Sequence, residues 1–258
     1  MCAWYITVRA NIIKRMARVK DKTMKNRRAK RVLFTVSLVA ALLGISSMWS
    51  RYVSGQNSAH DDYREVRDAL RRGGLREAAR VKGHYVGDFD PHWDFGRFDI
   101  EALTKNSAAV VVGVPSKIVG SRLVSHGQLI VTDYEVKVQE AFKGSVSEGS
   151  TITVSLPGGK VEFEDETSAE LRAREFEPMR VGATYTIFLS ESNDNPGVYT
   201  LSGGPQGLVE IVNDTTLKPH GRPADPVSEE TKGKGKDDFL KEVRSKAEKW
   251  PLPGKCCQ

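Results

Sequence analysis

The sequence predicts a mainly β protein, with a small antiparallel β-barrel, an N-terminal transmembrane helix and flanking amphipathic helices. Three observations support this prediction. An uncharged apolar run follows a dense block of Lys and Arg near the N-terminus, six short segments of alternating polar and apolar residues occupy the middle of the chain, and helical periodicity appears on both sides of them. Alternation indicates half-buried strands, and several short strands separated by turns are typical of barrels and sandwiches.

The apolar run, Val32–Trp49, contains no charged residue and just reaches the lower limit of roughly 17 residues for a membrane-spanning helix. Residues 1–31 contain eleven Lys and Arg and one acid, Asp21, so their net charge is +10. Because positive charge is retained on the cytoplasmic side, the N-terminus is expected in the cytoplasm and the rest of the chain beyond the membrane. The sequence therefore predicts a single-pass signal anchor at residues 32–49, which contacts the membrane.

A cleaved signal peptide is the alternative to an anchor, because the strongly apolar part, Val32–Ile45, is short. Translation from Met24 would give the proportions of an ordinary signal peptide. Residues 47–51 include Met, Trp and Arg and form a poor cleavage site, whereas residues 53–55 offer Val-Ser-Gly. The anchor is the favoured interpretation, and secretion after cleavage is the alternative.

The distribution of charge argues against nucleic acid as a partner. The whole chain carries +6, but residues 1–31 carry +10, so the remaining residues carry −4. A nucleic-acid-binding domain is expected to present a basic surface, and the exported part has no excess of basic residues. No nucleic-acid partner is therefore predicted.

The three cysteines, Cys2, Cys256 and Cys257, lie at the two ends of the chain. The folded middle must therefore depend on its apolar core rather than on disulfides. Prenylation needs a Cys fourth from the end, where this chain has Lys255. The Cys256-Cys257 pair is interpreted as part of an unstructured tail, with intermolecular disulfides as the alternative.

Helical periodicity precedes the strand-like region. Residues 61–72 have Tyr63, Val66 and Leu70 at helical spacing, and residues 75–82 resume the pattern after Gly73-Gly74. Two adjacent glycines tend to interrupt a helix, because glycine loses more backbone conformational entropy than other residues when it becomes ordered. The pattern predicts a juxtamembrane helix or helical hairpin, with a stalk that has no partner as the alternative.

Six segments have the alternation of strands, and turn residues such as Gly and Pro separate them. They cover residues 108–119, 130–142, 151–156, 184–190, 198–201 and 208–212. The second is the clearest, because Tyr134, Val136 and Val138 alternate with charged and polar residues. Since no helical pattern lies between most of the segments, a doubly wound α/β fold is disfavoured.

Three other regions complete the interpretation. Residues 162–177 are rich in Asp and Glu but lack calcium-loop spacing, so they are predicted to form a solvated loop with a helical turn. Residues 217–236 are predicted to be a flexible linker because they are rich in Pro, Gly and Lys. Asp237 is predicted to cap a last helix whose apolar face contains four residues: Phe239, Leu240, Val243 and Ala247.

These patterns divide the chain into six parts. They are a basic cytoplasmic segment (1–31), the anchor or signal peptide (32–49), a linker and juxtamembrane helical region (50–99), the β-barrel domain (100–216), the flexible linker (217–236), and a C-terminal amphipathic helix and tail (237–258). The barrel region has the size of a single domain.

Three stretches, Asn106–Val114, Thr132–Gly144 and Phe176–Leu189, combine strand patterns with the pairs Lys143-Gly144 and Val181-Gly182. Together they resemble the barrel of netrin-like and TIMP-like domains, as found in uncharacterised exported bacterial proteins. The resemblance covers about residues 100–212 and implies an OB-like barrel of five or six strands. The resemblance implies a TIMP-like protease inhibitor as an alternative function. That family inhibits metalloproteases through a cysteine directly after the signal peptide, and this sequence has no such cysteine, so the resemblance supports the fold rather than the inhibitory activity.

Four potential metal ligands occur at every second position: Asp88, Asp90, His92 and Asp94. In an extended chain they would share one face, and carboxylates with an imidazole form a candidate site for a divalent metal. The aromatic residues between them would face the other way, so the simpler alternative is that the acids face water while the aromatics seal the barrel. A metal-dependent envelope enzyme that uses this stretch is a further functional alternative.

The sequence contains neither Gly-x-Ser-x-Gly nor His-Glu-x-x-His, and Leu201–Gly207 is interpreted as a turn rather than as a phosphate-binding loop. No catalytic residue and no cofactor is therefore predicted. The leading hypothesis is a membrane-anchored, extracytoplasmic β-barrel interaction module at the cell envelope. Its partner is expected to be an envelope protein that contacts the barrel rim or the C-terminal helix.

Overall fold

The computed structural model describes residues 63–91, 96–192 and 195–251. The chain divides into two compact units, Met1–Arg64 and Glu65–Gln258, and nearly all of the described residues belong to the second. The basic segment 1–31 and the predicted anchor 32–49 lie outside the described residues. Within the described ranges, no helix has both the length and the apolar character needed to cross a membrane.

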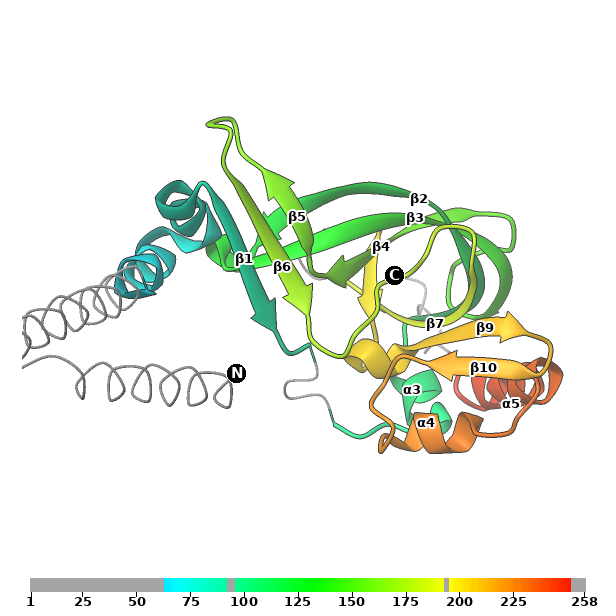
Figure 1. Cartoon of the computed structure of the whole chain (residues 1–258). Coiled ribbons are helices and arrows are strands. Elements are labelled where there is room, and N and C mark those ends of the chain that lie inside the picture. Colours follow the sequence, from blue (N-terminus) through cyan, green and yellow to red (C-terminus); the bar gives the residue numbers. More distant parts are fainter. Residues whose placement is uncertain (1–62, 92–95, 193–194, 252–258) are drawn as a thin grey trace, which may run out of the picture. The chain divides into compact units, whose positions relative to one another are not determined.

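Five strands pair in a closed ring, which confirms the prediction of a mainly β protein (Figure 1). They are β2 (Ala109–Val124), β3 (Leu129–Lys143), β4 (Thr151–Pro157), β7 (Thr184–Glu191) and β8 (Val198–Leu201). Ring neighbours are antiparallel, except that β4 and β8 are parallel. β9 (Leu208–Asn213) pairs with β7, and β10 (Thr216–Pro219) pairs with β9. Each of the six predicted strand segments overlaps one of these strands.

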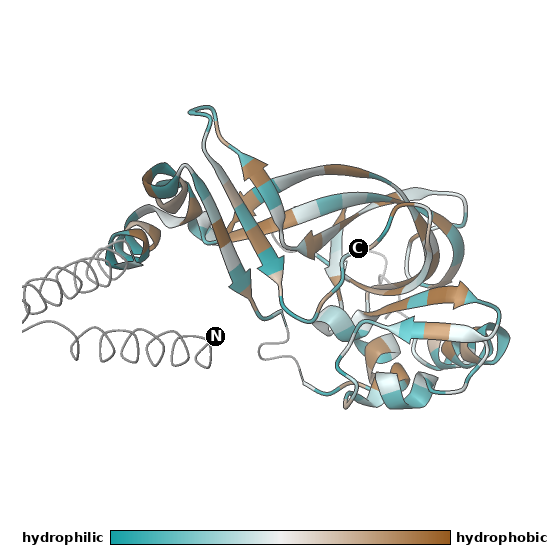
Figure 2. Cartoon of the chain, in the orientation of Figure 1, coloured by the Kyte–Doolittle hydropathy of each residue, from teal (hydrophilic) through white to brown (hydrophobic). Residues whose placement is uncertain are grey.

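Apolar side chains at alternate positions of the strands fill the inside of the ring. Tyr134, Val136 and Val138 on β3 are buried there, and they belong to one apolar cluster with Val111 of β2 and Ile187 of β7. Figure 2 shows brown and teal segments alternating along the strands. Because each fully buried side chain of this kind contributes roughly 1.5–3 kcal/mol, the inward-facing positions determine the register of the barrel.

A second apolar cluster lies on the outside of the ring, where three helices cover β2, β7 and β9 (Figure 1). The helices are α3 (Ile100–Asn106), α4 (Pro226–Thr231) and α5 (Lys236–Lys249). Val110 and Val112 of β2 point to this side and pack with Phe239 and Val243 of α5. The predicted apolar face of the last helix is therefore confirmed, although Gly235 rather than Asp237 is its N-cap. Asp237 lies in the first turn, where its charge favours the positive end of the helix dipole.

A separate three-stranded sheet has the order β1-β6-β5, with β1 (His84–Phe89) parallel to β6 (Ser168–Ala173) and β5 (Gly159–Glu162) antiparallel to it. The prediction of a loop with a helical turn at residues 162–177 is wrong, because β6 crosses this stretch. Ala169 and Leu171 are its buried positions. The abundance of acidic residues obscured this short alternation in the sequence.

Residues 63–82 are helical, and Gly74 has φ +70°, so the backbone changes direction at the predicted Gly-Gly break. Leu75 and Ala79 are buried against Ala169 and Leu171 of β6. This second part of the helical segment therefore packs on its own domain. Tyr63, which the sequence analysis placed on the apolar face, is 66% exposed.

The predicted flexible linker at residues 217–236 instead contains regular structure, namely most of β10 and the whole of α4. Val227 is fully buried in the helix-covered cluster, and Thr231 is 4% exposed. Two short elements with few apolar residues give little periodicity, so composition alone suggested a linker here.

The Lys143-Gly144 pair has a structural role. The Lys143 ammonium is buried and donates hydrogen bonds to the carbonyl oxygens of Thr104 (2.8 Å) and Lys105 (3.0 Å), at the C-terminal end of α3. A cation at this end of a helix satisfies free carbonyl groups and favours the helix dipole. Gly144 has φ +103°, and a Cβ atom there would lie 2.6 Å from the Ala108 carbonyl oxygen. The pair therefore joins α3 to the barrel.

Candidate functional site

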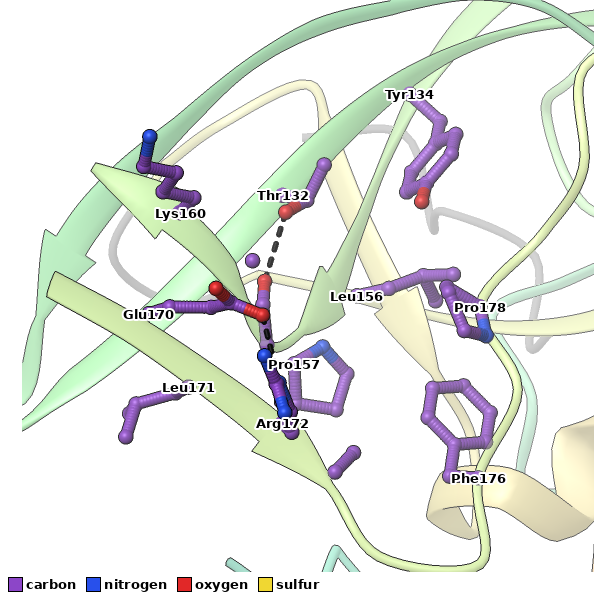
Figure 3. Close-up of a pocket in the computed structure, with 13 residues that line it drawn as sticks. Thr132, Tyr134, Leu156, Pro157, Lys160, Glu170, Leu171, Arg172, Phe176 and Pro178 are labelled. Atoms are coloured by element: carbon purple, nitrogen blue, oxygen red, sulfur yellow. Dashed lines mark hydrogen bonds and ion pairs between the residues drawn. The ribbon is translucent and has the colours of Figure 1, made fainter. Parts of the chain in front are cut away.

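A pocket of about 460 Å³ lies where the barrel meets the three-stranded sheet (Figure 3). Its volume is within the range of about 300–1,000 Å³ that is usual for small-ligand sites. Strands β3 and β4 of the barrel contribute Thr132, Tyr134 and Leu156, and β5 and β6 contribute the charged residues Lys160 and Arg172. The segment between β6 and β7 supplies a further wall. The pocket is therefore built from parts of the chain that are distant in sequence.

The turn between β4 and β5 explains why the two sheets separate here. Gly159 has φ +128°, a conformation that favours glycine, and a Cβ atom at this position would lie 2.1 Å from the Thr132 hydroxyl oxygen. The same hydroxyl donates a hydrogen bond to the Gly158 carbonyl at 2.7 Å. The backbone can pass this close to Thr132 of β3 as it leaves the barrel only because residue 159 has no side chain. The sequence analysis had identified Pro157-Gly158-Gly159 as a turn without assigning it a site.

The inner walls of the pocket are mainly apolar. Leu156 and Phe176 belong to the barrel core, and Leu171 belongs to the cluster beneath the three-stranded sheet. In Figure 3 the Tyr134 hydroxyl is turned toward Leu156 and Pro178, so the phenol adds a polar atom to an apolar wall. Burial and the nearby Tyr185 raise the pKa of Tyr134, so its hydroxyl stays protonated and able to donate a hydrogen bond at neutral pH.

Charged side chains of β5 and β6 form the rim. Lys160 pairs with Glu162 at 2.9 Å, and Arg172 pairs with Glu170 at 2.7 Å. Lys160 stands directly opposite Glu170 in the register of the two strands. The Arg172 guanidinium lowers the pKa of Glu170, so this carboxylate stays ionised. The rim therefore offers two cations and one carboxylate, and that carboxylate is already paired.

A buried polar cluster lies behind one wall of the pocket. The Phe176 ring meets the His220 ring edge to face, with 6.1 Å between ring centres. His220 Nδ1 lies 2.8 Å from the Glu177 carbonyl oxygen, so Nδ1 carries the proton and donates. His220 Nε2 lies 3.8 Å from Glu210 Oε2, and neither atom has a hydrogen-bond partner among the described residues. The other Glu210 oxygen accepts a hydrogen bond from Arg180.

This arrangement makes the His220 environment sensitive to protonation. Burial lowers the pKa of His220, and it outweighs the opposite effects of the Glu177 carbonyl and the Glu210 carboxylate. At neutral pH the histidine is therefore uncharged, and its Nε2 lone pair faces a carboxylate oxygen that is also an acceptor. Protonation would supply a donor between these two atoms but would add a charge to a buried position.

The candidate metal ligands are only partly visible. Asp88 lies on β1 at 3.8 Å from Arg174, and Asp90 follows the strand at 3.2 Å from Arg222. His92 and Asp94 lie outside the described residues. Among the residues that are described, no three His, Cys, Asp or Glu side chains gather as potential metal ligands. Asp88 and Asp90 therefore face different arginines, and the metal site stays a prediction.

The sequence analysis missed both the pocket and the buried cluster. Glu210 had a recognisable signal, since it is the one acid in the apolar strand β9 and shares the inward face of Leu208. His220 had none, because it lies at the end of β10 within the stretch interpreted as a linker. The Gly-rich stretch at Leu201–Gly207 is a turn with a short 3₁₀ helix, as predicted. Its Gln206 side chain holds the backbone of Gly96 and Phe98 through two hydrogen bonds.

No protein-family model matches the sequence, and no curated protein is significantly similar to it. The function must therefore be argued from the chemistry of the site itself. The pocket combines apolar walls, one buried phenol and a charged rim, which is the usual composition of a binding site.

Proposed function

We propose that this chain is a membrane-anchored, extracytoplasmic β-barrel interaction module, and that the pocket between the barrel and the three-stranded sheet is its binding site. One observation carries the proposal: a 460 Å³ pocket with apolar walls has three charged side chains at its rim. Apolar walls supply affinity, and a few placed polar groups supply specificity. A partner that inserts an apolar group can therefore be held at this position.

The pairing of the strands supports an OB-like barrel. Counted along the chain, the ring strands β2, β3, β4, β7 and β8 are the first to the fifth, and they pair in the order first, second, third, fifth, fourth. OB-like barrels bind their ligands over the second and third strands. Those strands are β3 and β4 here, and both line the pocket.

The proposed location rests on the sequence before the barrel. Residues 1–31 carry a net charge of +10, and the run Val32–Trp49 that follows is uncharged. This asymmetry favours a cytoplasmic N-terminus and export of everything after the anchor. Protease protection of a C-terminally tagged chain tests the topology. The protease should digest the tag while the inner membrane is still intact. A tag that is digested only after the inner membrane has been opened would contradict the proposal.

Site-specific photo-crosslinking in intact cells tests the binding site. A photoreactive residue at position 178, which is exposed and lines the pocket without contributing a charge, should give a crosslinked partner of defined mass. The same residue at Lys241, which is exposed on α5, is the matched control. A partner captured from position 178 and not from 241 supports the pocket. Equal capture from both positions, or capture only from 241, would contradict it.

A further inference from the structure

The polar groups of the pocket favour one charge type in its ligand. Lys160 and Arg172 are cations, and the Tyr134 phenol is a neutral donor, whereas Glu170 is the one charged acceptor. We propose that the pocket binds an apolar carboxylate, either the C-terminal residue of a polypeptide or a free organic acid. The proposal rests on the pocket being the binding site, and it adds the chemical class of the ligand.

The rim charges support an anion over a cation. Arg172 donates a hydrogen bond to Glu170 at 2.7 Å, and Lys160 lies opposite Glu170 in the strand register. The one carboxylate that lines the pocket is therefore flanked by two cations, and a cationic ligand would meet a net positive charge. Lys160 instead pairs with Glu162, which is 77% exposed and does not line the pocket. A ligand carboxylate can replace this solvent-exposed partner at little cost, because such ion pairs contribute little. Arg172 can bind a carboxylate through two parallel hydrogen bonds.

The interior supports an apolar body. Leu156, Leu171 and Phe176 present apolar surface to the pocket, and Figure 3 places Leu156 and Phe176 on the side away from Lys160. A ligand with its carboxylate at the rim would therefore direct its apolar group toward Phe176. The Tyr134 hydroxyl is turned toward Leu156 on the same side and can donate to a carbonyl or amide oxygen of the ligand. The carboxylate of an amphiphilic acid would thus contact the cations of the rim, and its apolar group would contact the apolar walls.

The test uses the full chain in lipid nanodiscs and fluorine-labelled probes observed by ¹⁹F NMR, with empty nanodiscs as the background. The first pair of probes is N-acetyl-4-fluorophenylalanine and its C-terminal amide, which differ only in the charge of the carboxyl group. We expect the acid to broaden and shift on addition of protein, and the amide to bind at least about fivefold more weakly. Equal binding of the two probes, or binding of neither, would overturn the proposal.

Variants locate the carboxylate. K160A/R172A should weaken binding of the acid at least about fivefold and leave the amide unchanged, because only the acid uses the cations. K117A is the matched control, since Lys117 is also an exposed cation paired with a strand carboxylate but does not line the pocket. A loss in K117A equal to that in K160A/R172A would show a general charge effect and overturn the assignment to the rim.

Two further probes separate the two sources of the ligand. A short peptide that ends in 4-fluorophenylalanine with a free carboxyl group represents a polypeptide C-terminus, and 3-(4-fluorophenyl)propanoate represents a free acid. Tighter binding of the peptide supports a protein partner, whereas equal or tighter binding of the propanoate supports a free acid. Replacing Ala173, which lines the pocket, by Trp fills the pocket. If the acid and the amide bind equally and A173W abolishes the binding of both, the charge assignment fails while the binding site stands. If no probe binds and position 178 captures no partner, both fail.

Discussion

The two sides of the barrel differ in how they are covered. On one side, α3, α4 and α5 pack on the outer faces of β2, β7 and β9, and an apolar cluster fills the space between them. On the other, the three-stranded sheet meets β3 and β4 around Gly158-Gly159 and leaves a pocket with a charged rim. Close packing of the first kind maximises stability, whereas incomplete packing of the second kind leaves space for a ligand. The difference separates the region that holds the fold from the region that is available for binding.

The largest effect on stability is expected on the helix-covered side. Phe239 is fully buried between α5 and the barrel, so F239A should leave a cavity and lower the free energy of unfolding by about 3–5 kcal/mol. Urea denaturation of the purified protein measures this loss. K241A, an exposed change on the same helix, is the control and should have little effect. A loss below about 1 kcal/mol in F239A would show that the helices contribute little to the core.

A smaller loss is expected beside the pocket. Leu171 is 7% exposed and lines the pocket, so L171A should lower the free energy of unfolding by about 2 kcal/mol, at the lower end for a buried leucine. The reason is that the pocket already leaves one side of this side chain without close contacts. The same denaturation measurement applies. A loss as large as that of F239A would mean that the pocket wall is packed as tightly as the helix-covered side.

His220 should make stability depend on pH. Burial lowers its pKa in the folded state, so the unfolded chain binds the proton more readily, and stability falls as pH decreases below the ordinary value of about 6.5. Thermal unfolding between pH 8 and 5 should therefore show a steeper decline for the wild type than for H220Q. Exposed His126 provides the control, H126Q, which should follow the wild type. Parallel curves for wild type and H220Q would contradict the role assigned to burial.

The smallest effect on stability is expected at the rim. Arg172 and its partner Glu170 form an ion pair whose arginine is 62% exposed, and such pairs contribute little to folding. R172A should therefore leave the unfolding midpoint unchanged within error while it weakens capture of the acidic probe. A clear loss of stability would indicate that Arg172 supports the sheet rather than a ligand.

The sequence predicted the barrel strands well because alternation is a local signal. The inward position of Tyr134 follows directly from its spacing with Val136 and Val138. Strand β6 was missed because it lies in a stretch, residues 162–177, that contains seven acids and only two buried strand positions. Helix α4 was missed because a helix of six residues has too few positions for a periodic pattern.

The pocket could not be predicted in the same way. It depends on how far β5 and β6 stand from β3, which is set by Gly159 and by contacts between residues distant in sequence. Phe176 had a local signal only as one apolar residue in an acidic stretch. The cluster of Glu210 and His220 likewise forms only when β10 returns beside β9. Long-range pairing of this kind is absent from any local pattern.

Filling the pocket tests the central claim most directly. Ala173 is half-buried and lines the pocket, so A173W would occupy its space while the exposed rim stays available. With the photoreactive residue at position 178, we expect A173W to abolish capture of the partner while the unfolding midpoint stays close to that of the wild type. Undiminished capture in a folded A173W chain would contradict the account, because the partner would then bind without entering the pocket.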